Sequence, residues 1–151
     1  MPPFPAWHPI VVHFAIALLA TAAGALVLAR FLKAPMVSAA AAVTGTWNLY
    51  LGALAAFFAA LTGLAAAFAS QCRGADAMHA VSLHFRWALA TTLLFALIAI
   101  GRLAQNRSDA PPSSAIATLL ALGFICLCIT GYLGGQNVYV HGIGVMRACV
   151  S

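Results

Sequence analysis

The chain contains 151 residues, of which 64% are hydrophobic and only 6% carry a charge. Soluble domains carry about 25% charged residues, so this composition excludes a soluble or intrinsically disordered protein and indicates an integral membrane protein. Seven basic residues stand against two acids, but they are scattered singly along the chain. Nucleic acid is therefore not an expected partner, and two acids are too few for paired-carboxylate chemistry.

Four apolar runs are long enough to cross a bilayer, since a helix needs roughly 20 residues to span about 30 Å of hydrocarbon. These runs are Ile10–Leu32, Thr46–Ala69, Met78–Leu103 and Ser114–Leu133. The predicted fold class is an all-α membrane protein, a four-helix transmembrane bundle that forms a single four-span domain over residues 1–151.

The basic residues predict the orientation of the spans, because cytoplasmic loops carry an excess of lysine and arginine. The ends of the first and third spans and the loops after them contain four basic residues, Arg30, Lys33, Arg102 and Arg107. The opposite side has three, of which Arg86 lies inside a span. We therefore expect a multi-pass protein of the bacterial inner membrane with both termini in the periplasm.

The first and third spans open on the same motif, His-x-x-x-x-His-Phe, at His8–Phe14 and His79–Phe85. An Ala-Leu pair follows at the same offset in both copies. The motif predicts two helical hairpins, about residues 8–70 and 79–141, repeated in parallel about an axis along the membrane normal. Chance similarity between two helices rich in alanine and leucine is the alternative.

All five histidines are expected near the periplasmic end of the bundle: His8, His13, His79, His84 and His141. Ionisable side chains inside a bilayer are costly and mark functional sites by default. His13 and His84 lie deeper in their helices than the first histidine of each motif, and the repeat places them at equal depth. Because haem iron accepts histidine as an axial ligand, the sequence predicts haem b with His13 and His84 as the first ligand pair. Hydrogen bonding of these rings to a neighbouring helix is the alternative.

Residues five apart on a helix differ by about 140° in direction, so the two histidines of one span cannot point to the same spot. This disfavours a four-histidine zinc site and favours one or two haems held by separate pairs. A second site would join His8 to His79. Two crossed pairs, His8 with His84 and His13 with His79, fit the repeat equally well, and His141 could replace any member.

Three further residues are candidates for this end of the protein. Arg86 could pair with a haem propionate, or else extend toward the lipid interface. Cys72 and Cys149 both fall on the predicted periplasmic side, where a disulfide between them is allowed. The sequence lacks Cys-x-x-Cys-His and His-Glu-x-x-His, which excludes covalent c-type haem and a zinc protease of that type.

Two motifs resemble a known family. They are His-Pro-x-x-Val-His-Phe at residues 8–14 and Thr-Gly-x-Leu-Gly-Gly-x-x-Val-Tyr-x-His-Gly-x-Gly-Val at residues 130–145. Together they resemble a bacterial family of four-span membrane proteins that carries a domain-of-unknown-function label. Some relatives look fused to Rieske or cytochrome c domains, which implies electron transfer. Relatives often carry an acid near the end of the second span, where this chain has residues 63–66 without one, so the resemblance does not support proton handling.

The sequence therefore leaves three functions to compare. The first is a membrane b-type cytochrome that relays electrons at the periplasmic face between a quinol and a periplasmic redox partner, as a subunit or anchor of a larger membrane complex. The second is a copper- or zinc-binding membrane protein, since imidazole suits both metals. The third is a structural membrane subunit without a cofactor. An electron carrier is expected rather than a stand-alone enzyme.

Overall fold

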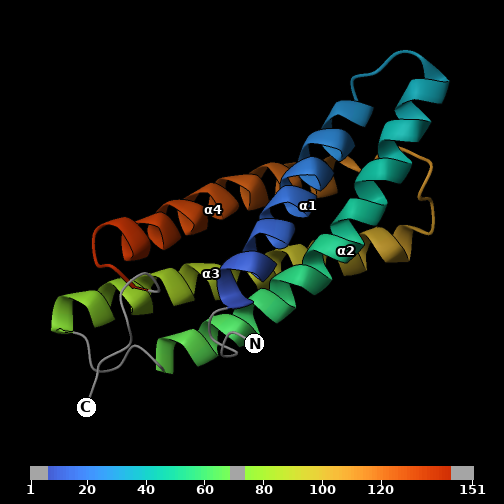
Figure 1. Ribbon diagram of the computed structural model, residues 1–151. Coiled ribbons are helices and arrows are strands. Elements are labelled where there is room, and N and C mark those ends of the chain that lie inside the picture. Colours follow the sequence, from blue (N-terminus) through green and yellow to red (C-terminus); the bar gives the residue numbers. More distant parts are fainter. Residues whose placement is uncertain (1–6, 69–73, 144–151) are drawn as a thin grey trace.

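A computed structural model describes residues 7–68 and 74–143, which form four helices (Figure 1). The helices are α1 (His8–Ala29), α2 (Pro35–Phe68), α3 (Ala75–Gln105) and α4 (Ser114–Tyr139). Each is long and apolar enough to cross a membrane. The predicted all-α membrane bundle is confirmed.

Three helices are longer than the apolar runs that predicted them, α2 and α4 by the most. Helix α2 begins at Pro35, well before Thr46, because proline fits the first turn of a helix and is followed by strong helix-forming alanines. Helix α4 continues beyond Leu133 to Tyr139, through two glycines. In a bilayer the backbone groups must be satisfied within the segment, which favours continuing the helix across such weak positions.

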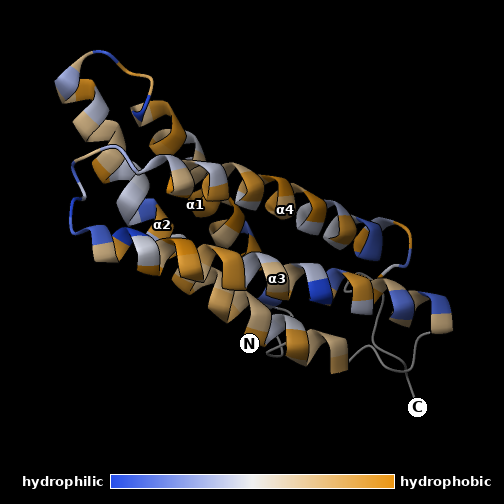
Figure 2. Cartoon of the chain, turned by 180° about the vertical axis from the view of Figure 1, so that it is seen from behind, coloured by the Kyte–Doolittle hydropathy of each residue, from blue (hydrophilic) through white to orange (hydrophobic). Residues whose placement is uncertain are grey.

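The helices form two antiparallel hairpins, α1–α2 and α3–α4, that pack on one another (Figure 1). Helix α1 also packs against α4, and α2 against α3, so α1 and α3 lie diagonally across the bundle. Hydrophilic residues gather mostly at the loops and helix ends (Figure 2). We call the end with the start of α1 and of α3 the histidine end, and the opposite end the arginine end.

Each helix buries a stripe of residues whose spacing alternates between three and four positions, the pattern of helices packed nearly parallel. In α3 the buried residues are Val81, Thr91, Phe95, Ile98 and Arg102. In α4 they are Ile116, Leu120, Gly123, Leu127 and Asn137. Positions in phase with these residues define what we call the core stripe. It passes through His84 in α3, through Thr130 and Gly134 in α4, and through His8 in α1.

Glycines of α2 let α1 approach closely. A Cβ added at Gly45 would lie 2.6 Å from Leu26 Cγ, and one added at Gly52 would lie 2.8 Å from Leu19 Cδ2. Such small residues are typical of helix contacts in membranes, where close packing replaces the hydrophobic effect as the source of stability. The first hairpin is therefore tightly joined along its length.

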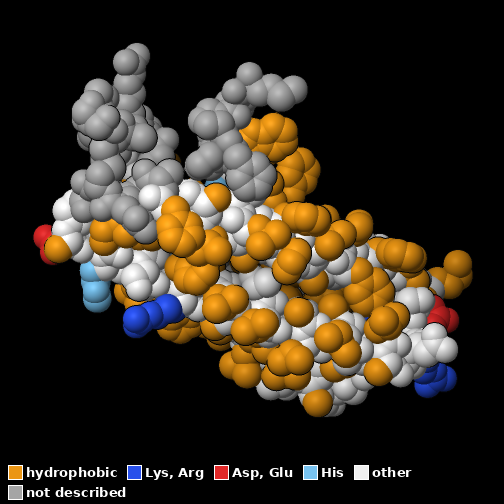
Figure 3. All heavy atoms as spheres, turned by 90° about the horizontal axis from the view of Figure 1, so that it is seen from below, with side chains coloured by type: hydrophobic (Ala, Val, Ile, Leu, Met, Phe, Trp, Pro, Cys, Tyr) orange, Lys and Arg blue, Asp and Glu red, His pale blue; other side chains and the backbone are white. Residues whose placement is uncertain are grey.

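The outer faces of the bundle carry large apolar side chains, whereas charged side chains lie toward the two ends (Figure 3). Phe14, Leu97 and Leu103 are each more than 60% exposed. Side chains of this kind on membrane-spanning helices contact lipid.

Arg102 closes the arginine end of the bundle. It is 1% exposed, and its guanidinium donates to Thr46 Oγ1 of α2 and Gln105 Oε1, both at 3.0 Å. It also donates to the backbone carbonyls of Ser108 and Ala110 in the α3–α4 loop. One side chain thus ties α2, α3 and that loop together.

We expect Arg102→Leu to lower the free energy of unfolding by about 2–3 kcal/mol, because buried carbonyl and hydroxyl acceptors lose their donors. Unfolding in mixed micelles, followed by circular dichroism, measures this change. Arg107→Leu is the matched control, since Arg107 is exposed in the same loop. Equal stability of the two variants would contradict the role assigned to Arg102.

Candidate functional site

Two imidazoles meet across the bundle axis at the histidine end. His8 is the first residue of α1, and His84 lies nine residues into α3. Their ring centroids are 6.5 Å apart, with the ring planes at 74° to one another. Both rings are half-buried and occupy the core stripes of diagonal helices. The structure therefore brings together the crossed pair His8 and His84.

Backbone carbonyls of the partner helices hold both rings in the same way. His8 Nδ1 lies 3.1 Å from the carbonyl oxygen of Ala59, and His84 Nδ1 lies 3.2 Å from that of Thr130. A carbonyl only accepts, so each Nδ1 carries the proton and each Nε2 carries the lone pair in the neutral ring. No described residue hydrogen-bonds to either Nε2. Two metal-ligating nitrogens are thus left available.

Two glycines provide the space for the rings. A Cβ at Gly63 of α2 would lie 2.9 Å from His8 Cε1, and one at Gly134 of α4 would lie 3.1 Å from His84 Cε1. In both hairpins the carbonyl that accepts from the ring belongs to the residue four positions before the glycine. The two hairpins therefore repeat one local arrangement, a histidine of the first helix packed on a glycine of the second.

Hydroxyl groups extend this polar cluster into the bundle. Thr62 Oγ1 lies 3.3 Å from His8 Nδ1 and donates to carbonyls of its own helix. Thr130 Oγ1 donates to Cys126 O, so its contact of 2.9 Å with Thr91 Oγ1 is a bond that Thr91 donates. Each of these hydroxyls therefore donates within the protein, Thr62 and Thr130 to their own helices and Thr91 to Thr130.

The other histidines predicted from the sequence lie elsewhere. His13 is exposed, and its Nδ1 contacts the Pro9 carbonyl of its own helix. His79 is exposed at the start of α3, and His141 is half-buried just after α4. The pair His13 and His84 is not brought together, and neither is His8 with His79.

The position of each histidine relative to the core stripe of its helix explains this pairing. The stripe of α1 passes through His8 and Ala15 and misses His13, whereas the stripe of α3 passes through Val81 and His84 and misses His79. The repeated motif thus supplies its first histidine in one hairpin and its second in the other. Steps of three and four residues back along α1 from the buried Ala15 lead to His8, so the spacing of the buried residues would have identified it.

The remaining candidates do not join the pair. Arg86 is exposed on α3, and no hydrogen bond within the described part of the chain engages its side chain. Cys72 and Cys149 lie outside the described residues, so the disulfide stays a prediction.

The separation of the two rings matches that of two imidazoles that would bind one metal from opposite sides. With metal–nitrogen bonds of about 2.0–2.1 Å, two imidazoles on opposite sides of one metal have ring centres about 6 Å apart, close to the separation observed. Residues 7–68 and 74–143 contain no group of three or more His, Cys, Asp or Glu side chains able to hold a metal ion. A haem takes at most two protein ligands, because the porphyrin supplies four others, whereas zinc sites use three or four.

A buried amide lies one turn beyond His84 toward the end of the bundle. Asn137 occupies the core stripe of α4 three residues after Gly134 and is 7% exposed. Its Oδ1 is buried and has no hydrogen-bond partner within the described part of the chain. Leaving such an acceptor unpaired costs about 1–3 kcal/mol. Sequence analysis did not single out this residue, although an asparagine in phase with an apolar stripe is a recognisable signal.

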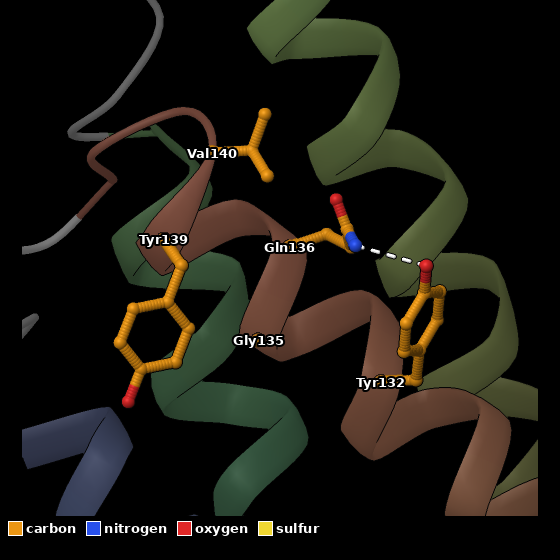
Figure 4. Close-up of a pocket in the computed structure, with 5 residues that line it drawn as sticks. All are labelled: Tyr132, Gly135, Gln136, Tyr139 and Val140. Atoms are coloured by element: carbon orange, nitrogen blue, oxygen red, sulfur yellow. Dashed lines mark hydrogen bonds between the residues drawn. The ribbon is translucent and has the colours of Figure 1, made fainter.

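A small surface pocket lies on the same stretch of α4 and includes none of the histidines (Figure 4). Tyr132 and Tyr139 point away from α4 in different directions with Gly135 between them, and Gln136 Nε2 donates to Tyr132 Oη at 2.9 Å (Figure 4). Tyr139 is 90% exposed. Exposed tyrosines of this kind are typical of the membrane–water interface.

Comparison with known proteins identifies the family but no activity. The model of a family described as "Predicted membrane protein (DUF2231)" matches residues 5–147. No curated protein matches the chain, and no solved structure does. Because the match covers both histidines of the pair and all four spans, the chain belongs to this family of predicted membrane proteins, DUF2231.

Proposed function

We propose that the protein is a b-type cytochrome of the membrane, with one haem held between His8 and His84. The observation that carries the proposal is the pair of neighbouring imidazoles, each fixed through Nδ1 to a backbone carbonyl. Metal-ligating histidines commonly donate their other N–H to such a group, which sets the tautomer and the ring orientation. Two diagonal helices of a bundle are a usual source of such ligands.

The chain's own groups determine what this site can do. The carbonyls of Ala59 and Thr130 hold the rings, and Gly63 and Gly134 keep the ring edges free of side-chain methyls. A bound haem supplies one-electron iron chemistry.

The position of the pair limits the route of electrons. Both rings lie at the histidine end, and the core stripe between them and Arg102 is mainly apolar. We therefore propose an electron relay at one face of the bilayer, between a quinol from the lipid and a redox partner outside it. The excess of basic residues at the opposite end supports a periplasmic position of that face in the bacterial inner membrane.

Copper or zinc binding by the same rings is the second candidate function, because imidazole suits both metals. The two-donor set favours haem over zinc. A colourless protein that contains copper or zinc in stoichiometric amounts would favour this second function.

Purified wild-type protein is expected to show a Soret band that shifts and sharpens on dithionite reduction. His8→Ala and His84→Ala should each abolish that band, because each removes one axial ligand. His13→Ala and His79→Ala are the matched controls, since both rings are exposed, and should keep it. Haem content by the pyridine haemochromogen assay measures the outcome.

Full haem content in both His8→Ala and His84→Ala would overturn the proposal. Loss of the band in His13→Ala together with His84→Ala, with His8→Ala unaffected, would instead establish the pairing expected from the repeated motif.

Gly63→Ala and Gly134→Ala are expected to displace the rings, because the new Cβ would lie within 3.1 Å of a ring carbon. Such overpacking costs about 1–3 kcal/mol, which corresponds to a loss of haem affinity of about 5- to 150-fold. Haem titration of the protein in detergent measures it. Gly131→Ala is the control, since nothing lies within 4 Å of its added Cβ. Equal affinity of all three variants would contradict the role of the two glycines.

Alkaline phosphatase fused after the C-terminal Ser151 is expected to be active, and the same enzyme inserted after Asn106 is expected to be inactive. The reason is the excess of basic residues at the arginine end, which favours the cytoplasm. Activity of the second fusion alone would reverse the proposed orientation.

A further inference from the structure

At the histidine end, one polar atom is buried without a hydrogen-bond partner among the described residues, and haem binding by His8 and His84 does not explain its position. Asn137 Oδ1 is buried in the core stripe of α4, and no described residue donates to it. Most buried polar atoms in proteins have a partner, so an exception calls for a specific explanation. Because the oxygen is an acceptor, the missing partner is a hydrogen-bond donor.

The place of Asn137 indicates where that donor lies. Thr130, Gly134 and Asn137 succeed one another on the same face of α4, and the first two hold His84. Asn137 is one helical turn from Gly134 toward the end of the bundle. The residue one turn from His84 in the same direction on α3 is the apolar Val81. The amide therefore lies on the core stripe, one turn beyond the part of α4 that holds His84.

We propose that the histidine end binds the headgroup of a lipid-soluble hydroquinone, with one ring hydroxyl donating to Asn137 Oδ1. A hydroquinone matches the requirements because it carries O–H donors on an apolar ring and reaches the site from the bilayer. The choice of a hydroquinone rests on the proposed electron relay, whereas the need for a donor at Asn137 does not. Small-molecule sites have this composition, mostly apolar with a few placed polar groups.

The test compares a ligand that has two ring hydroxyls with one in which both hydroxyls are methylated and no longer donate. A benzohydroquinone with a ten-carbon tail and its 1,4-dimethyl ether are titrated under anaerobic conditions into the wild-type protein in lipid nanodiscs. Isothermal calorimetry measures binding, and empty nanodiscs correct for partition into lipid. The hydroquinone is expected to bind about tenfold more tightly than the ether, the contribution of one well-formed hydrogen bond.

Asn137→Leu should remove this preference by weakening hydroquinone binding to the level of the ether. It should also unfold no more easily than the wild type, because it replaces an unpaired buried acceptor with an apolar group of similar size. Asn48→Leu is the matched control. Asn48 donates to Thr44 O of its own helix, away from the histidine end, so the preference should persist in that variant.

Equal binding of the two ligands by the wild-type protein would overturn the proposal, whatever the variants do. A preference that survives in Asn137→Leu would overturn it as well. The haem spectrum separates this result from the proposed function. A wild-type protein with the Soret band but no preference would refute the hydroquinone site alone. A protein without haem that keeps the preference would refute the cytochrome and support the donor site.

Discussion

The packing of an imidazole on a glycine is the contact on which the histidine end depends. His8 and His84 lie on the core stripes of their helices, where a larger neighbour than glycine would collide with the ring. Gly63 and Gly134 allow the approach, and carbonyls four residues earlier fix the ring direction. Because both hairpins repeat this contact, the two rings meet at the bundle axis, and each retains an Nε2 that no described residue occupies.

The two ends of the bundle use polar groups in different ways. At the arginine end, Arg102 is satisfied by neutral acceptors from α2, α3 and the following loop. At the histidine end, Asn137 Oδ1 is buried without a partner in the described part of the chain, and no described residue hydrogen-bonds to the Nε2 atoms of His8 and His84, which are not among the buried polar atoms. Satisfied buried polar groups stabilise a fold, whereas unsatisfied ones are tolerated mainly where a ligand completes them. This contrast favours the arginine end as structural and the histidine end as functional.

The fold could be predicted from composition and the length of the apolar runs, because the bilayer fixes the length and allows only helices in such runs. The ends of α2 and α4 could not, since Pro35 and Gly134 break helices in water but are compatible with these positions. The gathering of histidines at one end was also predictable. Their pairing was not predictable from the repeat alone, because the core stripe includes the first histidine of one motif and the second histidine of the other. His13 and His79 are exposed as a result. Asn137 was missed because hydropathy averages conceal one amide in an apolar stripe.

The two rings differ in how firmly the chain carries them. His84 lies inside α3, with nine helical residues before it, whereas His8 is the first residue of α1. Helix termini open with far less free energy than helix interiors. Local opening at this site therefore begins with the first turn of α1, while the His84 side stays in place. A large flat ligand would accordingly enter by displacement of the first turn of α1, whereas α3 and α4 would keep their positions.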